Sequence, residues 1–153
     1  MMFKTHLAAG ALAGIFLFQY SMPSQPLLFA FVFLFSSILP DIDTTKSVIG
    51  KRLWYVSSIL AIFTRHRGFF HTIWIPMAVF GIGLYFNRIL CTAFALGYFV
   101  HIASDLMTSE GVSLFSPLSK HHVRGFIKTG GTIEYVLLFI LCIAIGIQAI
   151  KFY

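Results

Sequence analysis

Five apolar segments, separated by short polar stretches, constrain this chain more than any other feature. They cover approximately residues 7–20, 27–39, 68–86, 89–107 and 133–150. A helix needs about 20 apolar residues to cross a bilayer, and the second segment, which Pro40 ends, is shorter than that. Only 10% of the residues are charged and 58% are hydrophobic, so charged side chains are too few to cover a soluble surface. We therefore predict an all-α fold, a polytopic membrane helical bundle of about five spans, in a single domain over residues 1–153.

The two long connections between these segments differ in character. Residues 41–64 place Trp54 and Tyr55 shortly after Lys51 and Arg52, and aromatic residues beside basic ones favour a short helix that lies on the membrane surface. Residues 108–132 are rich in glycine, serine and lysine, and we expect them to form a loop.

The lysines and arginines indicate which ends of the segments face the cytoplasm. Cytoplasmic loops collect these residues. With a cytoplasmic N-terminus and five spans, nine of the eleven lie on that side, and the exceptions are Arg88 and Lys151. The net charge of +6 then reflects membrane topology. Since no nucleic-acid-binding motif is visible, we expect no nucleic-acid partner.

Histidines and acidic residues gather at the same cytoplasmic ends. The set comprises His6, Asp41, Asp43, His66, His71, His101, Asp105 and Glu134. The topology was assigned from lysine and arginine alone, so this convergence is an independent observation. Polar groups within membrane spans are costly and mark candidate functional sites. Together these residues predict one ionisable cluster at the cytoplasmic face.

The spacing and chemistry of this cluster indicate a metal site. His101 and Asp105 lie four residues apart and share one face of a helix, whereas Asp41 and Asp43 follow a proline in an extended turn. Imidazole and carboxylate together suit zinc, manganese or iron. Seven candidate ligands are more than one tetrahedral ion needs, so we expect two or more ions, as in binuclear phosphoester hydrolases. These candidates are His6, Asp41, Asp43, His66, His71, His101 and Asp105.

Five motifs together resemble a known family. They are Thr5-His6, LPDID at residues 39–43, HRGFFHT at residues 66–72, HIASD at residues 101–105 and LFSPLS at residues 114–119. In this order, over almost the whole chain, they resemble the YdjM-type family of bacterial and archaeal inner-membrane proteins, described as LexA-regulated, predicted metal-dependent hydrolases. Where that family has HRG-x-THS, this chain has HRGFFHT, which keeps both histidines.

The resemblance implies an enzyme and its location. The family is distantly similar to zinc-dependent phospholipase C, a helical enzyme with a multi-zinc site, so it implies a helical core of that kind, phosphoester hydrolysis and an inner-membrane location. Asp43 would bind a metal or position a water, and Glu134 resembles a late acid of the family. The ligands that the motifs imply are His6, Asp41, one of His66 and His71, His101 and Asp105.

We thus expect a multi-pass, metal-dependent hydrolase that cleaves a phosphoester of a phospholipid or lipid-linked phosphate at the cytoplasmic face. Zinc is the expected cofactor, with manganese and iron as alternatives. Arg67, and with it Arg65, would pair with the substrate phosphate, because guanidinium binds phosphate through two hydrogen bonds. Asp43 or Glu134 would accept a proton. The expected partners are membrane lipids and an anionic phosphoester, while the leaving group and the oligomeric state stay open.

Two other functions also stay open. One is a transporter, although transport sites typically lie near the bilayer midplane between repeats, and no repeat is visible here. The other is a non-catalytic membrane protein whose metal only staples short helices together. A site open to water would favour catalysis, and a closed shell of protein ligands would favour the staple.

Overall fold

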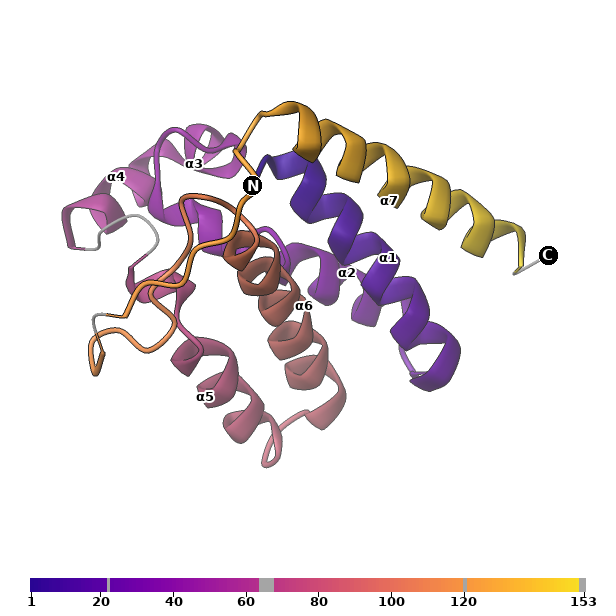
Figure 1. Cartoon of the computed structure of the whole chain (residues 1–153). Coiled ribbons are helices and arrows are strands. Elements are labelled where there is room, and N and C mark those ends of the chain that lie inside the picture. The colour runs from indigo at the N-terminus through magenta and orange to yellow at the C-terminus, as the bar shows by residue number, and fades with distance from the viewer. Residues whose placement is uncertain (22, 64–67, 120, 152–153) are drawn as a thin grey trace.

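The structure is a computed structural model that describes residues 1–21, 23–63, 68–119 and 121–151. These residues form seven α-helices and two 3-10 helices (Figure 1). In chain order they are α1 (Phe3–Ser21), α2 (Pro26–Ser36), η1 (Leu39–Asp43), α3 (Val48–Arg52), α4 (Trp54–Phe63), η2 (Phe69–His71), α5 (Trp74–Gly83), α6 (Arg88–Leu106) and α7 (Thr132–Ile150). Two isolated β-bridges, Thr108 to Ile127 and Val112 to Val123, tie the loop before α7 together. The all-α prediction is confirmed for the described residues.

Two helices of the described chain are long and apolar enough to cross a membrane. They are α6 and α7, each of 19 residues. The helix α1 has the same length but carries Lys4, His6 and Gln19, and it is not among them. The helices α2 and α5 have 11 and 10 residues, so each is only about 15 Å long, half of a hydrocarbon core. Of the about five expected spans, two among the described residues are therefore long and apolar enough to cross a membrane.

Two expected segments have different bounds for identifiable reasons. The helix α2 stops at Ser36, before Pro40, because the hydroxyls of Ser36 and Ser37 bond to the carbonyls of Phe33 and Leu34 in its last turn. The expected third segment, residues 68–86, is divided into η2 and α5. Pro76 lies in the first turn of α5, where a missing N–H removes no intrahelical bond.

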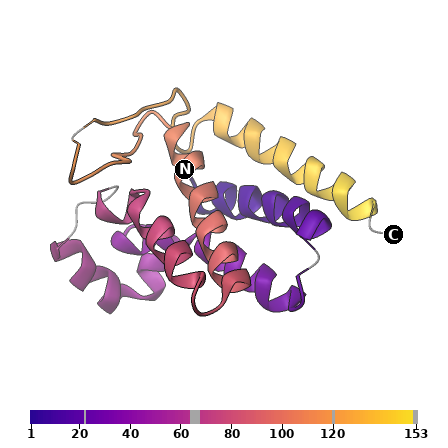
Figure 2. The ribbon, with the colours of Figure 1, turned by 90° about the horizontal axis from the view of Figure 1, so that it is seen from below.

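The helix α6 forms the centre of the molecule. The helices α1, α2 and α5 pack against it, and α7 lies beside α1 (Figures 1 and 2). The helices α1 and α7 run parallel. The Met2 N–H donates to Glu134 Oε1 over 2.6 Å near their starts, and Gln19 Nε2 donates to Gln148 Oε1 over 3.4 Å near their ends. The arrangement brings the N-terminal end of α1 to the C-terminal end of α6.

Two glycines let the end of α2 fit between α1 and α6. A Cβ at Gly97 of α6 would overlap Ser36 Oγ and the carbonyl of Phe33. A Cβ at Gly10 of α1 would overlap the side chain of Ser37. Both glycines are thus needed for close helix approach, and this approach sets the distance between the polar ends of α1 and α6.

The polarity of the molecule is reversed relative to a soluble protein. Among the described residues, the buried set contains more polar and charged residues than apolar ones, while many large apolar side chains are exposed on α2, α4, α5 and α7. Soluble proteins bury their aliphatic and aromatic residues and expose their charges. This reversal agrees with a chain that meets lipid outside and gathers its polar chemistry within.

Candidate metal centre

Five of the predicted ligands converge at one end of the helices. His6 comes from α1, Asp41 from η1, His71 from η2, and His101 and Asp105 from α6. Each is buried, and Asp41 alone of the five retains appreciable exposure, at 9%. Two overlapping groups bring one ligand atom per residue within 4.8 Å of one another. They are His6, Asp41 and His101, and His71, His101 and Asp105.

His101 lies at the centre of this cluster. Its Nδ1 is 2.8 Å from the carbonyl oxygen of Ser37, which can only accept, so the Nδ1–H donates and the lone pair of a neutral ring is on Nε2. That Nε2 faces the other donors, 3.2 Å from His71 Nε2 and 3.8 Å from both Asp41 Oδ1 and Asp105 Oδ2. A backbone carbonyl on the outer nitrogen is the usual way to orient a metal-binding histidine. Because His101 has one available lone pair and belongs to both groups, they form one connected cluster.

A carboxylate lies beside the outer nitrogen of His71. Its Nδ1 lies 3.4 Å from Asp43 Oδ2, while its Nε2 lies 3.4 Å from Asp105 Oδ2 and 3.9 Å from Asp41 Oδ1. The short helix η2 is held from α6, because the hydroxyl of the buried Tyr98 donates to the carbonyl of Phe70 over 2.5 Å. Asp43 is therefore placed on the outer side of the His71 ring and belongs to neither donor group.

His6 closes the cluster from the side of α1. Its ring stacks on that of His101, with centroids 3.9 Å apart and an angle of 11° between the planes. His6 Nε2 lies 3.4 Å from Asp105 Oδ1, which also pairs with the amino group of Met1. The Nδ1 of His6 is buried with no hydrogen-bond partner among the described residues.

These donors fit a divalent metal ion. Atoms that bind one ion at about 2.0–2.2 Å lie about 3–4 Å from each other, which is the range seen between the facing atoms of the cluster. Three imidazoles with two carboxylates form a ligand set for zinc, manganese or iron. A buried imidazole nitrogen without a partner, as in His6, is costly unless something binds it.

Asp41 connects the cluster to the surface. It lines a cleft of about 570 Å³ together with Phe3, Lys46, Val48 and Glu110. Burial raises the pKa of the Asp41 carboxyl above its usual value, an effect that the nearby imidazole of His6 opposes. The cleft is a route by which water or a small polar group reaches a donor of the cluster.

Other predicted site residues lie elsewhere. Glu134 is buried, and its two oxygens accept the backbone N–H groups of Met2 and Gly130, each over 2.6 Å. It joins the loop before α7 to the start of α1 and is in neither donor group, so its catalytic role stays a prediction. His66 and Arg67, with Arg65, fall outside the described residues.

Sequence reasoning missed the groups that orient the ligands. The carbonyl of Ser37 leaves no trace in a residue pattern, because every residue has one. Tyr98 did leave a signal, since it is a polar side chain inside an apolar segment, three residues before His101 and on the same helical face.

Comparison with known proteins finds one matching family profile and several similar proteins. The profile of the family described as "YdjM inner membrane protein" matches residues 1–152. The chain is 34% identical over 94 residues to the inner membrane protein YdjM of Escherichia coli, covering 55% of this chain and 46% of that protein. It therefore spans about half the length of that relative. It is 26% identical over 138 residues to the uncharacterized protein YvsG of Bacillus subtilis, covering 88% of this chain and 86% of YvsG. No solved structure gives a significant match.

Proposed function

The chain belongs to the family of YdjM inner membrane proteins, and from this membership and its histidine–aspartate cluster we propose that it is a metal-dependent hydrolase. The proposed substrate is a phosphoester of a phospholipid or lipid-linked phosphate, cleaved at the cytoplasmic face. The proposed ion is zinc, with manganese and iron as alternatives that the same ligands accept.

One observation carries this proposal. The buried donors of four separate elements face one another, and one of them, Asp41, also lines an open cleft. A site that only fastens helices together needs no opening to the surface, whereas a catalytic site must keep a position for water or substrate. The cleft beside Asp41 supplies that access.

The chain's own residues would divide the work between binding the ion and binding the substrate. His6, Asp41, His71, His101 and Asp105 would hold the ion. When bound, the ion would lower the pKa of a water molecule and stabilise negative charge on phosphoryl oxygens.

Lys46 lines the cleft, and its ammonium would bind the phosphate as a point charge. Arg67 remains a second candidate for that role. Asp43 would act as a positioning residue for His71, because a carboxylate on the outer nitrogen fixes the ring and raises its basicity as a ligand.

We propose a multi-pass topology with a cytoplasmic N-terminus. The helices α1 and α7 run parallel and both begin at the cluster end, as expected if both leave the cytoplasmic face together. The shorter α2 and α5 would sit partly within the bilayer, beside α6. The lysine and arginine distribution supports this orientation.

Hydrolysis by the purified protein tests the proposal. We expect the full chain, in detergent with zinc or manganese, to hydrolyse one phosphoester bond of phosphatidylglycerol and release glycerol phosphate or glycerol, and a chelator to abolish the release. Asp105→Asn should lower the rate by at least about 100-fold, whereas His121→Ala, which changes an exposed loop histidine, should not. Equal rates for Asp105→Asn and the parent protein would contradict the proposal.

A second function, the non-catalytic metal staple, is favoured by the depth of the site. Four of the five donors are almost fully buried, and they join α1, η1, η2 and α6. For a staple, chelation would lower the unfolding temperature while no phosphoester is hydrolysed under any metal condition. The hydrolysis assay, run beside thermal unfolding, separates the two functions.

A further inference from the structure

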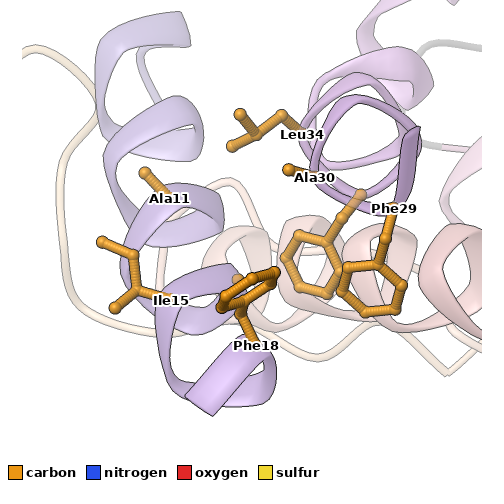
Figure 3. A pocket seen from close by; sticks show the side chains of 8 residues that line it. Ala11, Ile15, Phe18, Phe29, Ala30 and Leu34 are labelled. Carbon is orange, nitrogen blue, oxygen red and sulfur yellow. The ribbon is translucent and has the colours of Figure 1, made fainter. Parts of the chain in front are cut away.

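An apolar groove runs between α1 and α2, farther from the cluster end of the two helices. It has a volume of about 310 Å³. Ala11, Ile15 and Phe18 of α1 face Phe29, Ala30 and Leu34 of α2 across it (Figure 3). The small side chains of Ala11 and Ala30, with Gly14, leave the space that larger residues would fill.

The α1 wall of this groove continues to the cleft beside the cluster. Residues three and four apart share one helical face, so Phe3, Leu7, Ala11 and Phe18 form a single stripe along α1. Phe3 lines the cleft that contains Asp41, and Ala11 and Phe18 line the groove. Leu7, between them, is 37% exposed. No buried side chain on this stripe separates the groove from the cleft.

The α2 wall leads to the same place. Leu34 lines the groove, and seven residues later Asp41 lines the cleft. The helix ends between them at Ser36, where Ser37 approaches Gly10 of α1. This contact closes the space between the two helices at that level, so a molecule with one polar end and one apolar end would pass outside it, over the exposed Leu7, with its polar end at Asp41 and its apolar end in the groove.

We propose that this groove binds an acyl chain of the lipid substrate and thereby places its phosphoester at the metal centre. The inference rests on the proposed hydrolase function and adds the place where the hydrocarbon part of the substrate binds. The polar end would meet Lys46 in the cleft, and the chain would follow the α1 stripe past Leu7 into the groove.

The chemistry of the lining selects an alkyl chain over a peptide. The groove walls are almost wholly apolar, so the N–H and C=O groups of a bound peptide would be left without partners, which is costly. A hydrocarbon chain has no such groups. From Phe3 to Phe18 the stripe is about 22 Å long, which exceeds the depth of one leaflet, about half of a 30 Å hydrocarbon core.

Photo-crosslinking tests the groove without requiring catalysis. The probe is phosphatidylglycerol with a diazirine midway along one acyl chain, in phosphatidylcholine vesicles that hold the full-length protein. We expect crosslinks on residues 11–18 and 29–34, and a loss of about tenfold or more in Ala30→Phe, which fills the groove. The matched control is Ala78→Phe, which changes another exposed alanine, on α5, and should leave the groove crosslinks unchanged.

Chain-length dependence gives the second measurement and separates this inference from the hydrolase proposal. With the groove in use, kcat/KM should rise with acyl length for the parent protein and stay flat for Ala30→Phe. Groove crosslinks without any hydrolysis would uphold the lipid site and overturn the hydrolase. Hydrolysis that is indifferent to acyl length, with crosslinks spread evenly over α5 and α7, would uphold the hydrolase and overturn the lipid site.

Discussion

The helices α6 and α7 have the same length and pass the same test for a membrane span, yet they occupy opposite environments. In α6, 39% of an apolar stretch of 18 residues is buried within the molecule, whereas in the corresponding stretch of α7 only 6% is buried. The helix α6 carries Gly97, Tyr98, His101 and Asp105 among its buried residues, and α7 buries only Glu134. Its remaining surface exposes isoleucine, phenylalanine and valine.

Mean hydropathy therefore identifies a membrane span, whereas the polar positions within the span indicate which of its faces packs against other parts of the chain. A polar side chain in a span must face protein or water, so Tyr98, His101 and Asp105 of α6 require other parts of the chain around them, while Gly97 permits the close approach of α2. Beyond its first turn, α7 buries no such residue, its polar Gln148 contacts Gln19 of α1 near the helix end, and it can meet lipid on most of its surface. The predictions below test this contrast.

Glycine substitutions should give the largest contrast between the two helices. A Cβ at Gly97 would overlap the backbone of Phe33, whereas a Cβ at Gly146 of α7 meets nothing within 4 Å. We expect Gly97→Leu to cost more than about 3 kcal/mol, beyond typical overpacking. Gly146→Leu should change stability by less than about 1 kcal/mol, and in the stabilising direction. Thermal unfolding in detergent measures both, and similar melting temperatures for the two variants would break the comparison.

A charge on the exposed face of α7 should have a nearly equal cost, which would appear in the free energy of membrane insertion. Ile140 is 55% exposed near the middle of α7, and a lysine at a span centre costs about 2.5–3.5 kcal/mol of insertion free energy. We expect Ile140→Lys to reduce the fraction that resists alkaline extraction, while Ile140→Leu leaves it unchanged. Normal insertion of Ile140→Lys would mean that this face does not meet lipid.

Removal of one hydroxyl from α6 should have a moderate effect. Tyr98→Phe leaves the carbonyl of Phe70 without its donor, at a cost of about 1–2 kcal/mol. Because η2 carries His71, we also expect metal affinity to fall by about tenfold. Titration with zinc in a competing chelator measures this, and Tyr135→Phe on the exposed side of α7 is the control. A Tyr98→Phe protein with unchanged metal affinity would show that η2 needs no support from α6.

The smallest effect should come from the polar contact between α1 and α7. Gln19 and Gln148 share one side-chain hydrogen bond of 3.4 Å, and such bonds between membrane helices average about 0.6 kcal/mol. Gln148→Leu should therefore lower the unfolding temperature only slightly. A large loss would mean that α7 depends on this bond and is held less by lipid than its exposure indicates.

Residue chemistry could predict the site better than the fold around it. The positions of His6, Asp41, His71, His101 and Asp105 at one end of the bundle follow from the apolar segments and their alternating direction. Helix lengths did not follow, because hydropathy does not register the hydroxyls that end α2 or the 3-10 turn that precedes α5.

The orientation of the ligands was also beyond the sequence. It depends on a backbone carbonyl at Ser37 and on which nitrogen of His71 faces Asp43. The position of Glu134 outside the donor groups was also beyond the sequence, because its oxygens accept backbone N–H groups that have no sequence signature.

Metal content is the most direct test of the central claim that the ends of α1, η1, η2 and α6 form a metal centre. Elemental mass spectrometry would be applied to the full chain purified in detergent, beside His101→Ala, Asp105→Ala and the exposed-loop control His121→Ala. We predict about one or two zinc, manganese or iron ions per chain, retained in His121→Ala and lost in both other variants. A well-folded protein that holds no such ion and takes up none when it is supplied would contradict the account.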